Sequence, residues 1–564
     1  MSKSFLYALL GLIIFACTTE KPNYGVNNAE IPAGLSKWKD QKFSMFIHWG
    51  LYSIPGGIWK GEQISGYSEQ IQGHARIPRE EYMQLADEFN PAAWNPDSVV
   101  LLAKTAGMQS VVITAKHHDG FSLFHTKQSA FNVVDATPYK RDILKELAAA
   151  CARHGLRFGV YFSLIDWNYP GAMPFESTVN SDSIPPAHHA FNLKQVEELM
   201  TGYGEISEVW FDMGAPTAQQ SKELVDVVKK HQPDCMVSGR IWNDQGDFIV
   251  MGDNKRPGFL MGVPWQTPAS MYDETWGYRS WQEHEDLDVK VKEKIHDLVN
   301  IVSMGGNYLL NIGPNGNGEV VPFEKQVLQG VGAWMKTNGV SIYNTVPSPI
   351  EMGGWGTTTM KPGKLYLHMM RKPSGNMLIV PGLDIDVKSA RFLNRPGELL
   401  DAAVNSYTFS VALPEEIIPD YLPVIEVEYD GEMVYSSLKQ IQAEYDNSYV
   451  LGYDNARQYH SFSGREYYSL KPTVVKLSWQ ISPARSLDMM VTARHDSLSE
   501  NRQYVLAVNG QEYPWKMEAG EVSKALGIIN LHADKPNTIE LWASDRKNPH
   551  VDMEAKGLKI VFSL

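Results

Sequence analysis

Polar and aromatic side chains follow directly on several short apolar runs in the first half of the chain. The runs end in the segments FIHWG, TAKHHDG, VYFSLIDW, EVWFDMG and SGRIWND, which carry His48, His117, His118, Tyr161, Trp210, Asp212 and Arg240. Any one of these residues has an ordinary structural explanation as a loop cap, a core histidine or half of an ion pair. Five such segments in succession indicate a common site, because the carboxyl ends of parallel strands meet on one face of a barrel.

A carboxylate, imidazoles, a guanidinium and aromatic rings without a cofactor motif suit the hydrolysis of a glycoside. That reaction requires a carboxylate nucleophile, a proton donor, hydrogen-bonding partners for hydroxyls and an apolar platform. Asp212 ends a predicted strand directly after Trp210 and Phe211, and we predict it to be the nucleophile. Capping of a helix is its competing role, but the next predicted helix begins near Thr217, which can provide its own cap.

A catalytic metal is the competing explanation for His48, His117 and His118. Neighbouring residues on a strand point to opposite faces, so His117 and His118 are poor joint ligands unless the strand bulges. The sequence also has no HxH or HExxH spacing. We therefore expect no metal and no cofactor, and a metal-dependent hydrolase would reveal itself by loss of activity with chelators.

Strands and helices alternate along residues 35–344. Strands are predicted at Phe43–Trp49, Ser110–Lys116, Arg157–Leu164, Ile206–Asp212, Met236–Ile241 and Tyr308–Ile312. Amphipathic helices are predicted at Pro78–Phe89, Pro96–Ala106, Asp142–His154, Leu193–Tyr203, Ser221–His231 and Asp288–Met304. The alternation predicts an α/β domain with a (β/α)₈-like TIM barrel. A doubly wound open sheet is the alternative, but no Gly-rich phosphate loop follows any of these strands.

The rest of the chain reads as short strands separated by turns. We predict a β-sandwich domain over residues 345–435 and a second, C-terminal β-rich domain over 440–564. In the latter, Trp479, Trp515 and Trp542 are either platforms for a glycan or core residues, of which the core role is commoner in a β-sandwich.

The composition excludes some partners, and the N-terminus predicts a location. The chain has 564 residues and a formal net charge of −14, without a basic run, so we expect no nucleic-acid partner.

Lys3 and an apolar run from Phe5 to Ala16 precede Cys17. Residues 1–17 therefore resemble a lipoprotein-type signal peptide ending at Cys17, with a linker over 18–34. We expect a protein of the periplasm or cell surface that meets a bacterial outer membrane only through a lipid anchor at Cys17.

Longer motifs carry a family resemblance. The segments KFSMFIHWGLYSIPGG, VVITAKHHDGFSLF, DATPYKRDILKELAAACARHG, VWFDMG and GGNYLLNIGP resemble the α-L-fucosidases of glycoside hydrolase family 29 over residues 35–345. The resemblance implies a barrel followed by a sandwich, and an exo-acting, configuration-retaining mechanism without a metal. Asp212 matches the family nucleophile. The residues that match, or lie among, the substrate-binding positions are His48, Glu69, His117, His118, Tyr161, Trp210, Arg240 and Trp276.

Two departures from the family pattern concern the sugar wall and the acid/base. Gln70 stands where the family usually has Trp, and Gln266 stands in PWQT where many members have a Glu that serves as acid/base in some subgroups. Three explanations remain open: the acid has moved, the glutamine was introduced to trap a ligand, or the protein binds sugar without turnover. For a relocated acid, Glu274 is the favoured candidate, with Asp273 and Asp253 as the others.

The function expected from these observations is a retaining exo-α-L-fucosidase acting on fucosylated glycans, sulfated or algal ones included. An α-L-galactosidase of the same family is the first alternative, because Gln70 offers a partner for the additional hydroxyl of L-galactose. A carbohydrate-binding lipoprotein with impaired catalysis is the second. In each case the partner is an oligo- or polysaccharide.

Overall fold

The computed structural model describes residues 33–176, 182–373, 375–416, 421–436, 440–462, 472–496, 498–533, 535–544 and 556–564. The predicted signal peptide, Cys17 and most of the predicted linker lie outside these residues. Within the described part of the chain, no helix is long and apolar enough to cross a membrane.

Eight parallel strands form the first sheet. They are β1 (Phe43–Ile47), β4 (Ser110–Lys116), β5 (Arg157–Ser163), β6 (Glu208–Asp212), β7 (Met236–Val237), β8 (Ile249–Val250), β9 (Trp265–Ala269) and β10 (Asn307–Ile312). Their order in the sheet is β7-β6-β5-β4-β1-β10-β9-β8. A parallel bridge between Ser238 and Phe248 links the two ends of this curled sheet. Their central positions are buried because one face fills the barrel interior and the other lies under helices.

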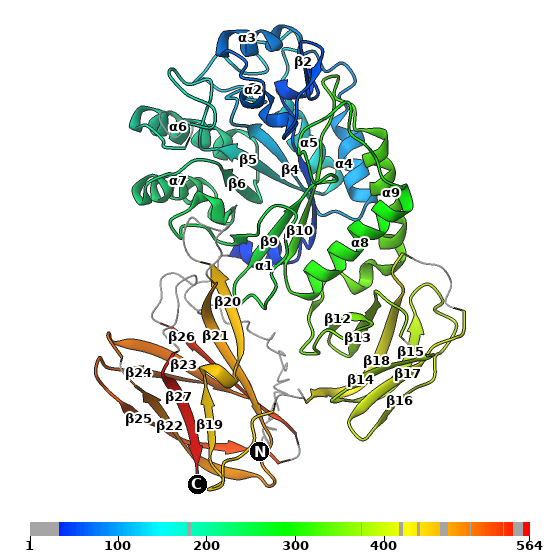
Figure 1. Ribbon diagram of the computed structural model, residues 1–564, viewed down its shortest axis with the longest axis vertical. Helices are drawn as coiled ribbons and strands as arrows, with labels where there is room; N and C mark the ends of the chain where they lie inside the picture. The colour runs from blue at the N-terminus through cyan, green and yellow to red at the C-terminus, as the bar shows by residue number, and fades with distance from the viewer. Residues whose placement is uncertain are drawn as a thin grey trace, which may run out of the picture.

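Helices cover the outside of the curled sheet, as Figure 1 shows for α6 and α7 on one side and α8 and α9 on the other. The helices are α1 (Ala33–Lys39), α2 (Ile71–His74), α3 (Arg79–Met83), α4 (Pro96–Thr105), α5 (Ile143–His154), α6 (Pro186–Gly202), α7 (Ala218–His231), α8 (Leu287–Ser303) and α9 (Pro322–Asn338). Side-chain caps begin several of them: Asn95 for α4, Asp142 for α5 and Asp286 for α8. Thr217 caps α7 in a full capping box, as predicted, so Asp212 is left for another role.

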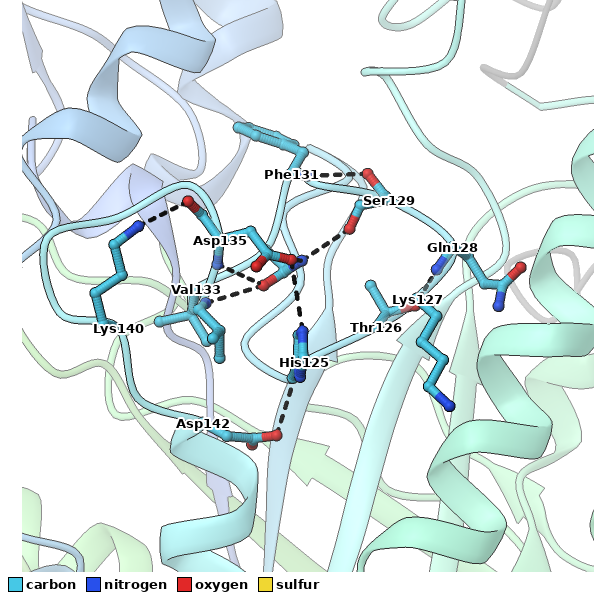
Figure 2. A network of polar contacts seen from close by, with 12 residues as sticks. His125, Thr126, Lys127, Gln128, Ser129, Phe131, Val133, Asp135, Lys140 and Asp142 are labelled. Carbon is cyan, nitrogen blue, oxygen red and sulfur yellow. Dashed lines mark hydrogen bonds and ion pairs between the residues drawn. The ribbon is translucent and has the colours of Figure 1, made fainter.

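The loop from β4 to α5 is long but internally bonded (Figure 2). The amide of Asn132 donates to the carbonyl of Ser129 at 2.8 Å and to Asp135 Oδ2 at 2.7 Å. At the end of the loop, the backbone N–H of His125 donates to Asp142 Oδ2 at 3.0 Å. These contacts fix the loop that begins with His117, so this side chain enters the site from a rigid support.

Two β-sandwiches follow the barrel and lie side by side below it (Figure 1). The first joins the sheets β11-β12-β13-β18-β15 and β14-β17-β16. Its strands are β11 (Val346–Pro347), β12 (Gly356–Lys361), β13 (Lys364–Met369), β14 (Met377–Pro381), β15 (Leu383–Phe392), β16 (Ala402–Asn405), β17 (Thr408–Ala412) and β18 (Val424–Tyr435).

The C-terminal sandwich joins the sheets β19-β27-β22-β25 and β20-β21-β26-β23-β24. Its strands are β19 (Tyr449–Gly452), β20 (Arg457–Phe462), β21 (Pro472–Ile481), β22 (Leu487–His495), β23 (Arg502–Val508), β24 (Gln511–Met517), β25 (Ser523–Leu531), β26 (Asn537–Ala543) and β27 (Leu558–Ser563). Trp479 and Trp542 are buried, and Trp515 stacks on Tyr504 with ring centroids 4.8 Å apart. These rings pack within the sandwich, in keeping with core residues.

The C-terminal sandwich touches the barrel through strand β20. His460 N donates to the carbonyl of Leu260 at 2.9 Å, and Gly262 N donates to the carbonyl of His460 at 2.8 Å. The imidazole of His460 also lies 4.7 Å from the ring of Phe259. This backbone pairing attaches the sandwich to the loop between β8 and β9.

The predicted (β/α)₈-like barrel with two β-sandwiches after it is confirmed, although several element predictions differ in detail. The strand predicted at Met236–Ile241 has only two residues, and a 3₁₀ turn at Gly239–Ile241 replaces its second half. The helix predicted at Pro78–Phe89 breaks after Met83 into the 3₁₀ turn Gln84–Asp87. Strands β8 and β9 and helix α9 were not predicted.

Candidate active site

A cavity of about 280 Å³ opens at the carboxyl ends of the barrel strands. Its lining residues are Phe46, His48, Tyr67, Glu69, Gln70, His117, Asp182, Trp210, Asp212, Met213, Gly214, Arg240, Trp242, Asp253 and Trp276. Six of the eight predicted substrate-binding residues, and the predicted nucleophile, are therefore brought together from segments far apart in the sequence.

Asp212 ends β6 and is held by two donors. Arg240 Nη1 donates to Asp212 Oδ1 at 3.0 Å, and the hydroxyl of Tyr161 donates to Oδ2 at 3.0 Å. Only 15% of the Asp212 side chain is exposed. Because each oxygen has one fixed donor, the carboxylate is oriented and keeps lone pairs for a reaction.

The guanidinium of Arg240 joins two carboxylates. Besides Asp212, it contacts Oδ1 of Asp253 through Nη2, and the same nitrogen donates to the carbonyl of Met251 at 3.3 Å. The guanidinium also lies over the ring of Trp210, 4.9 Å from its centroid. Its side chain is only 7% exposed, so little water screens these interactions.

The backbone takes left-handed conformations around these residues. Met213, directly after the nucleophile, has φ 64°, and Trp242, Asn243 and Asp244 have φ 64°, 53° and 56°. Such conformations cost free energy in residues with a side chain and are concentrated at functional sites. Asn243 Nδ2 stabilises the turn by donating to the carbonyl of Pro216 at 3.0 Å.

His48 presents an acceptor to the cavity. The amide of Asn311 donates to the carbonyl of Trp276 at 2.7 Å, which turns its Oδ1 towards His48 Nδ1 at 2.8 Å. Burial lowers the pKa of His48 to about 4, so the ring is neutral near pH 7. With the proton on Nδ1, the Nε2 lone pair is left to accept a hydrogen bond from a hydroxyl.

Glu69 is held by the loop that carries Trp276. The backbone N–H groups of Trp276 and Gly277 donate to Glu69 Oε2 at 3.1 and 2.9 Å, and the hydroxyl of Thr275 lies 3.3 Å away. Burial raises the pKa of Glu69, while these donors oppose the shift. All three of these contacts fall on one oxygen of a residue that lines the cavity.

Stacked aromatic rings contribute to the cavity wall. His117 stacks on Tyr161 with centroids 5.0 Å apart and an interplanar angle of 6°, and Tyr161 stacks on Trp210 at 5.7 Å. Burial, followed by the neighbouring His118 and His48, lowers the pKa of His117 well below its usual value. His117 therefore acts as a neutral imidazole beside the pocket.

Some predicted residues do not line the cavity. His118 lies in the turn after β4, with its ring 4.0 Å from that of His117, and stacks on Trp167 at 3.8 Å. Tyr161 lies beneath the wall and acts through Asp212. Glu274 and Asp273 are exposed and are not among the lining residues, and the side chain of Glu274 contacts Gln282 at 3.4 Å.

Sequence reasoning missed Tyr67, Asp182, Trp242 and Asn311. Asn311 carries a usable signal, because in the strand NYLLNI every second residue from Asn307 faces the interior. The others lie on loops, where no periodicity marks their direction. Among the described residues, no group of three His, Cys, Asp or Glu side chains is placed to hold a metal ion.

Comparison with known sequences assigns the chain to a family. A family profile described as Alpha-L-fucosidase matches residues 13–340. The chain belongs to the α-L-fucosidase family. The predicted family membership is therefore confirmed, and the protein is a glycoside hydrolase. The tissue α-L-fucosidase of Rattus norvegicus is 31% identical over 341 residues, which cover 56% of this chain and 71% of the relative.

Solved α-L-fucosidases share the architecture. The enzyme from Vibrio sp. strain EJY3 is 27% identical with a TM-score of 0.66, and the match covers 96% of this chain and 99% of that one. A Bacteroides thetaiotaomicron α-L-fucosidase, solved as a trapped covalent intermediate with 2-fluoro-fucosyl fluoride in a Glu→Gln variant, is 27% identical with a TM-score of 0.65. That match covers 73% of this chain and 100% of the relative.

Proposed function

We propose that this chain is a retaining exo-α-L-fucosidase that releases terminal α-L-fucose from glycans. The observation that carries the proposal is Asp212 at the base of a cavity of about 280 Å³, held by Tyr161 and Arg240 beside a second carboxylate. A cavity of this size holds one sugar ring, which favours release from a chain end.

In the first step, an oxygen of Asp212 attacks the anomeric carbon and forms a glycosyl ester. The bond from that carbon to the leaving oxygen breaks, and a protonated carboxyl group gives its proton to the leaving oxygen. In the second step, water loses a proton to the same carboxylate and attacks the anomeric carbon, which releases Asp212 and L-fucose. Retaining glycosidases follow this double displacement. The covalent intermediate trapped in the Bacteroides relative supports it.

We assign the proton-transfer role to Asp253 in place of Glu274. Asp253 lines the cavity and shares the guanidinium of Arg240 with Asp212, whereas Glu274 is exposed outside it. One guanidinium between two carboxyl groups suits the spacing of about 5–5.5 Å that retaining enzymes use. Once Asp212 is esterified its charge is gone, and Arg240 is left to support Asp253 as the base.

The sugar hydroxyls are recognised by groups with fixed directions. His48 Nε2 accepts, the carboxyl group of Glu69 accepts, and the ring of Trp276 supplies an apolar face. A site that leaves such buried groups unpaired with the wrong sugar rejects that sugar strongly. His117 adds a further neutral imidazole to the wall.

The charges around the cavity favour an unsulfated substrate. Glu69, Asp182 and Asp212 line it beside the proposed proton donor Asp253, and Arg240 is the only cation among its described lining residues and already faces Asp212 and Asp253. A sulfate group would meet more negative than positive charge. We therefore propose neutral fucosylated glycans in place of sulfated ones.

An α-L-galactoside is the second candidate substrate. Gln70 lines the cavity and its side chain is partly exposed. Its amide can bond the additional hydroxyl of L-galactose, which an apolar wall rejects by only about 10²-fold.

The direct test is hydrolysis of the 4-nitrophenyl α-L-fucoside and α-L-galactoside by the natural chain and by Asp212→Ala. We expect turnover of the fucoside that disappears in Asp212→Ala, because nitrophenolate leaves without a proton and reports the nucleophile alone. A preference for the galactoside would make an α-L-galactoside the substrate in place of the α-L-fucoside. Binding of L-fucose without turnover of either substrate would favour the carbohydrate-binding lipoprotein.

We further propose a periplasmic or surface location with a lipid anchor at Cys17, as the N-terminal sequence suggests. Expression of Cys17→Ser in a Gram-negative host should move the protein from the membrane fraction to the soluble fraction. An unchanged distribution would reject the anchor.

A further inference from the structure

A buried amide inside the barrel lies behind the wall of the active site. Gln266 on β9 is fully buried and is not among the lining residues. Its Oε1 accepts the indole N–H of Trp210 at 2.9 Å, and its Nε2 donates to Glu208 Oε2 at 3.2 Å. One side chain thus links two residues of β6 across the barrel interior.

Both ends of this amide are used in a way that a carboxylate cannot reproduce. Glu208 is fully buried and accepts from the indole N–H of Trp38 at 3.0 Å and from Gln41 Nε2 at 3.4 Å, so it needs donors. Trp210 needs an acceptor. A carboxylate at position 266 would satisfy Trp210 but would place a second acidic group against Glu208 in a buried site.

Trp210 connects Gln266 to the two residues that hold the nucleophile. Its ring stacks on Tyr161 at 5.7 Å and lies under the guanidinium of Arg240 at 4.9 Å. Tyr161 and Arg240 are the two donors that hold Asp212. Glu208, Trp210 and Asp212 alternate along β6, so all three face the interior in one column.

The backbone of Gln266 supports the second carboxylate as well. Its carbonyl accepts the N–H of Met251 at 2.9 Å, and the carbonyl of Met251 accepts from Arg240 Nη2 at 3.3 Å. Asp253 follows two residues later on the same segment. The position of β9 is therefore coupled to both carboxylates that Arg240 joins.

We infer that Gln266 is a positioning residue for Asp212, acting through Trp210, and is not the remnant of a lost acid. The amide of Gln266 fixes the position of the Trp210 indole, and the indole in turn fixes the positions of Tyr161 and Arg240. This inference rests on the proposed function for its catalytic readout. It accounts for the glutamine in PWQT without an introduced substitution and without loss of catalysis.

The experiment compares Gln266→Met, Gln266→Glu, Trp210→Phe and the double variant Trp210→Phe/Gln266→Met. Gln266→Met keeps the volume but removes both hydrogen bonds, and we expect kcat on 4-nitrophenyl α-L-fucoside to fall about tenfold or more with KM changed less, since loss of orientation acts in the transition state. The kcat of Gln266→Glu should fall at least as far, both on substrates with an activated leaving group and on substrates with an unactivated one.

The double variant separates positioning from general damage to the fold. Trp210→Phe removes the indole N–H that donates to Gln266, so the side chain at position 266 no longer orients that ring through a hydrogen bond. We expect Gln266→Met to lower kcat by no more than about threefold in the Trp210→Phe background, a coupling typical of residues in one hydrogen-bond network. An equal fall in kcat in both backgrounds would overturn the inference.

Gln195→Met is the matched control. Gln195 is also fully buried and bonded, to Ser122 at 3.4 Å and to Thr126 at 3.3 Å, but none of these three residues lines the cavity. The Gln195→Met variant should be less stable than the natural chain but should have the same kcat. An unchanged kcat in Gln266→Met, or a gain in Gln266→Glu on a sugar leaving group, would contradict the inference, and the gain would identify a dormant acid.

Failure of the proposed function is recognised separately. If the natural chain turns over neither aryl glycoside, the proposed function fails, and the series is then judged by the affinity for L-fucose in calorimetry. A loss of affinity in Gln266→Met that shrinks in the Trp210→Phe background supports the positioning of Trp210, and equal affinity in all variants contradicts it.

Discussion

At the scale of single residues, the site depends on one cation between two carboxyl groups. Arg240 contacts Asp212 and Asp253 and is itself held by Trp210. Its loss would leave the Asp212 carboxylate without a counter-charge and Asp253 without this donor, so Arg240 cannot be exchanged for a neutral side chain without altering both chemical steps.

The role of Asp253 predicts a dependence on the leaving group. In Asp253→Asn, kcat/KM for a fucoside with a sugar leaving group should fall by about 10²–10⁴-fold, the usual contribution of a general acid. The value for 4-nitrophenyl α-L-fucoside should change far less, because nitrophenolate needs no proton.

Glu274→Gln is the control for Asp253→Asn and should behave as the natural chain on both substrates, since its side chain is exposed outside the cavity. Equal losses on both substrates in Asp253→Asn would show that Asp253 is needed for another reason. A large loss on the sugar leaving group with a small loss on the nitrophenyl substrate in Glu274→Gln would identify Glu274 as the acid.

Sequence predicted site residues well where they follow a patterned strand. His48, Trp210 and Asp212 lie at such strand ends and are in the cavity. The motif alone could not separate His117, which lines the cavity, from His118, which stacks behind it, because the direction depends on an irregularity in the pairing of β4 near Lys116. Asp253 was one of three candidates until its contact with Arg240 distinguished it.

At the scale of elements, the barrel presents its site on short strand ends fastened by helices. Glu324 on α9 is 3% exposed and accepts the N–H of Gly313, just beyond β10, at 3.2 Å. Burial raises the pKa of Glu324 to about 8, so the folded protein holds this proton across a range where the unfolded chain has lost it. The contact therefore contributes less stability as pH rises from about 4.5 towards 8.

Glu324→Gln should remove this pH dependence. The amide keeps an acceptor for Gly313 and has no proton to lose, so the variant should melt above the natural chain by a margin that grows from pH 5 to pH 8. The change should be about 1–2 °C per kcal/mol, because the entropy of unfolding grows with domain size. Thermal unfolding at several pH values measures it. A constant or shrinking margin would contradict the assignment of a buried, protonated carboxyl group.

Three amphipathic helices were predicted closely, whereas helix α9 was not predicted, helix α6 begins at Pro186 and not at the predicted Leu193, and the shortest strands were missed. The helices at α4, α5 and α8 lie within about one residue of the predicted bounds. Strand β8 has two residues and β9 reads WQTPA, in which Pro268 and two polar residues hide the strand pattern. Tertiary pairing with β10 imposes the strand at β9, so no local signal could reveal it.

At the scale of the whole molecule, the C-terminal sandwich supports the loop between β8 and β9. Strands β20 and β21 reach up to the barrel in Figure 1, and His460 pairs with Leu260 and Gly262. The same loop carries Asp253 a few residues earlier. The whole-length similarity to the Vibrio α-L-fucosidase includes this sandwich.

Gly262→Val should loosen the attachment. A Cβ at this position would lie 2.5 Å from Val475 Cγ2, so a side chain forces β21 away from the loop. We expect faster amide hydrogen exchange over residues 258–262 and a lower kcat/KM, with the barrel helices unchanged. The exposed Gly258→Val, which has no neighbour within 4 Å of its Cβ among the described residues, is the control. Unaltered exchange in Gly262→Val would show that the sandwich does not support the loop.

The most direct test of the central claim, a retaining fucosidase with Asp212 as nucleophile, is mass spectrometry of the chain after incubation with 2-fluoro-fucosyl fluoride. The fluorine slows hydrolysis of the glycosyl ester, so we predict one added 2-fluoro-fucosyl group per chain, mapped to Asp212 after digestion and absent in Asp212→Ala. Turnover of fucosides without any adduct, or an adduct on another carboxylate, would contradict the account.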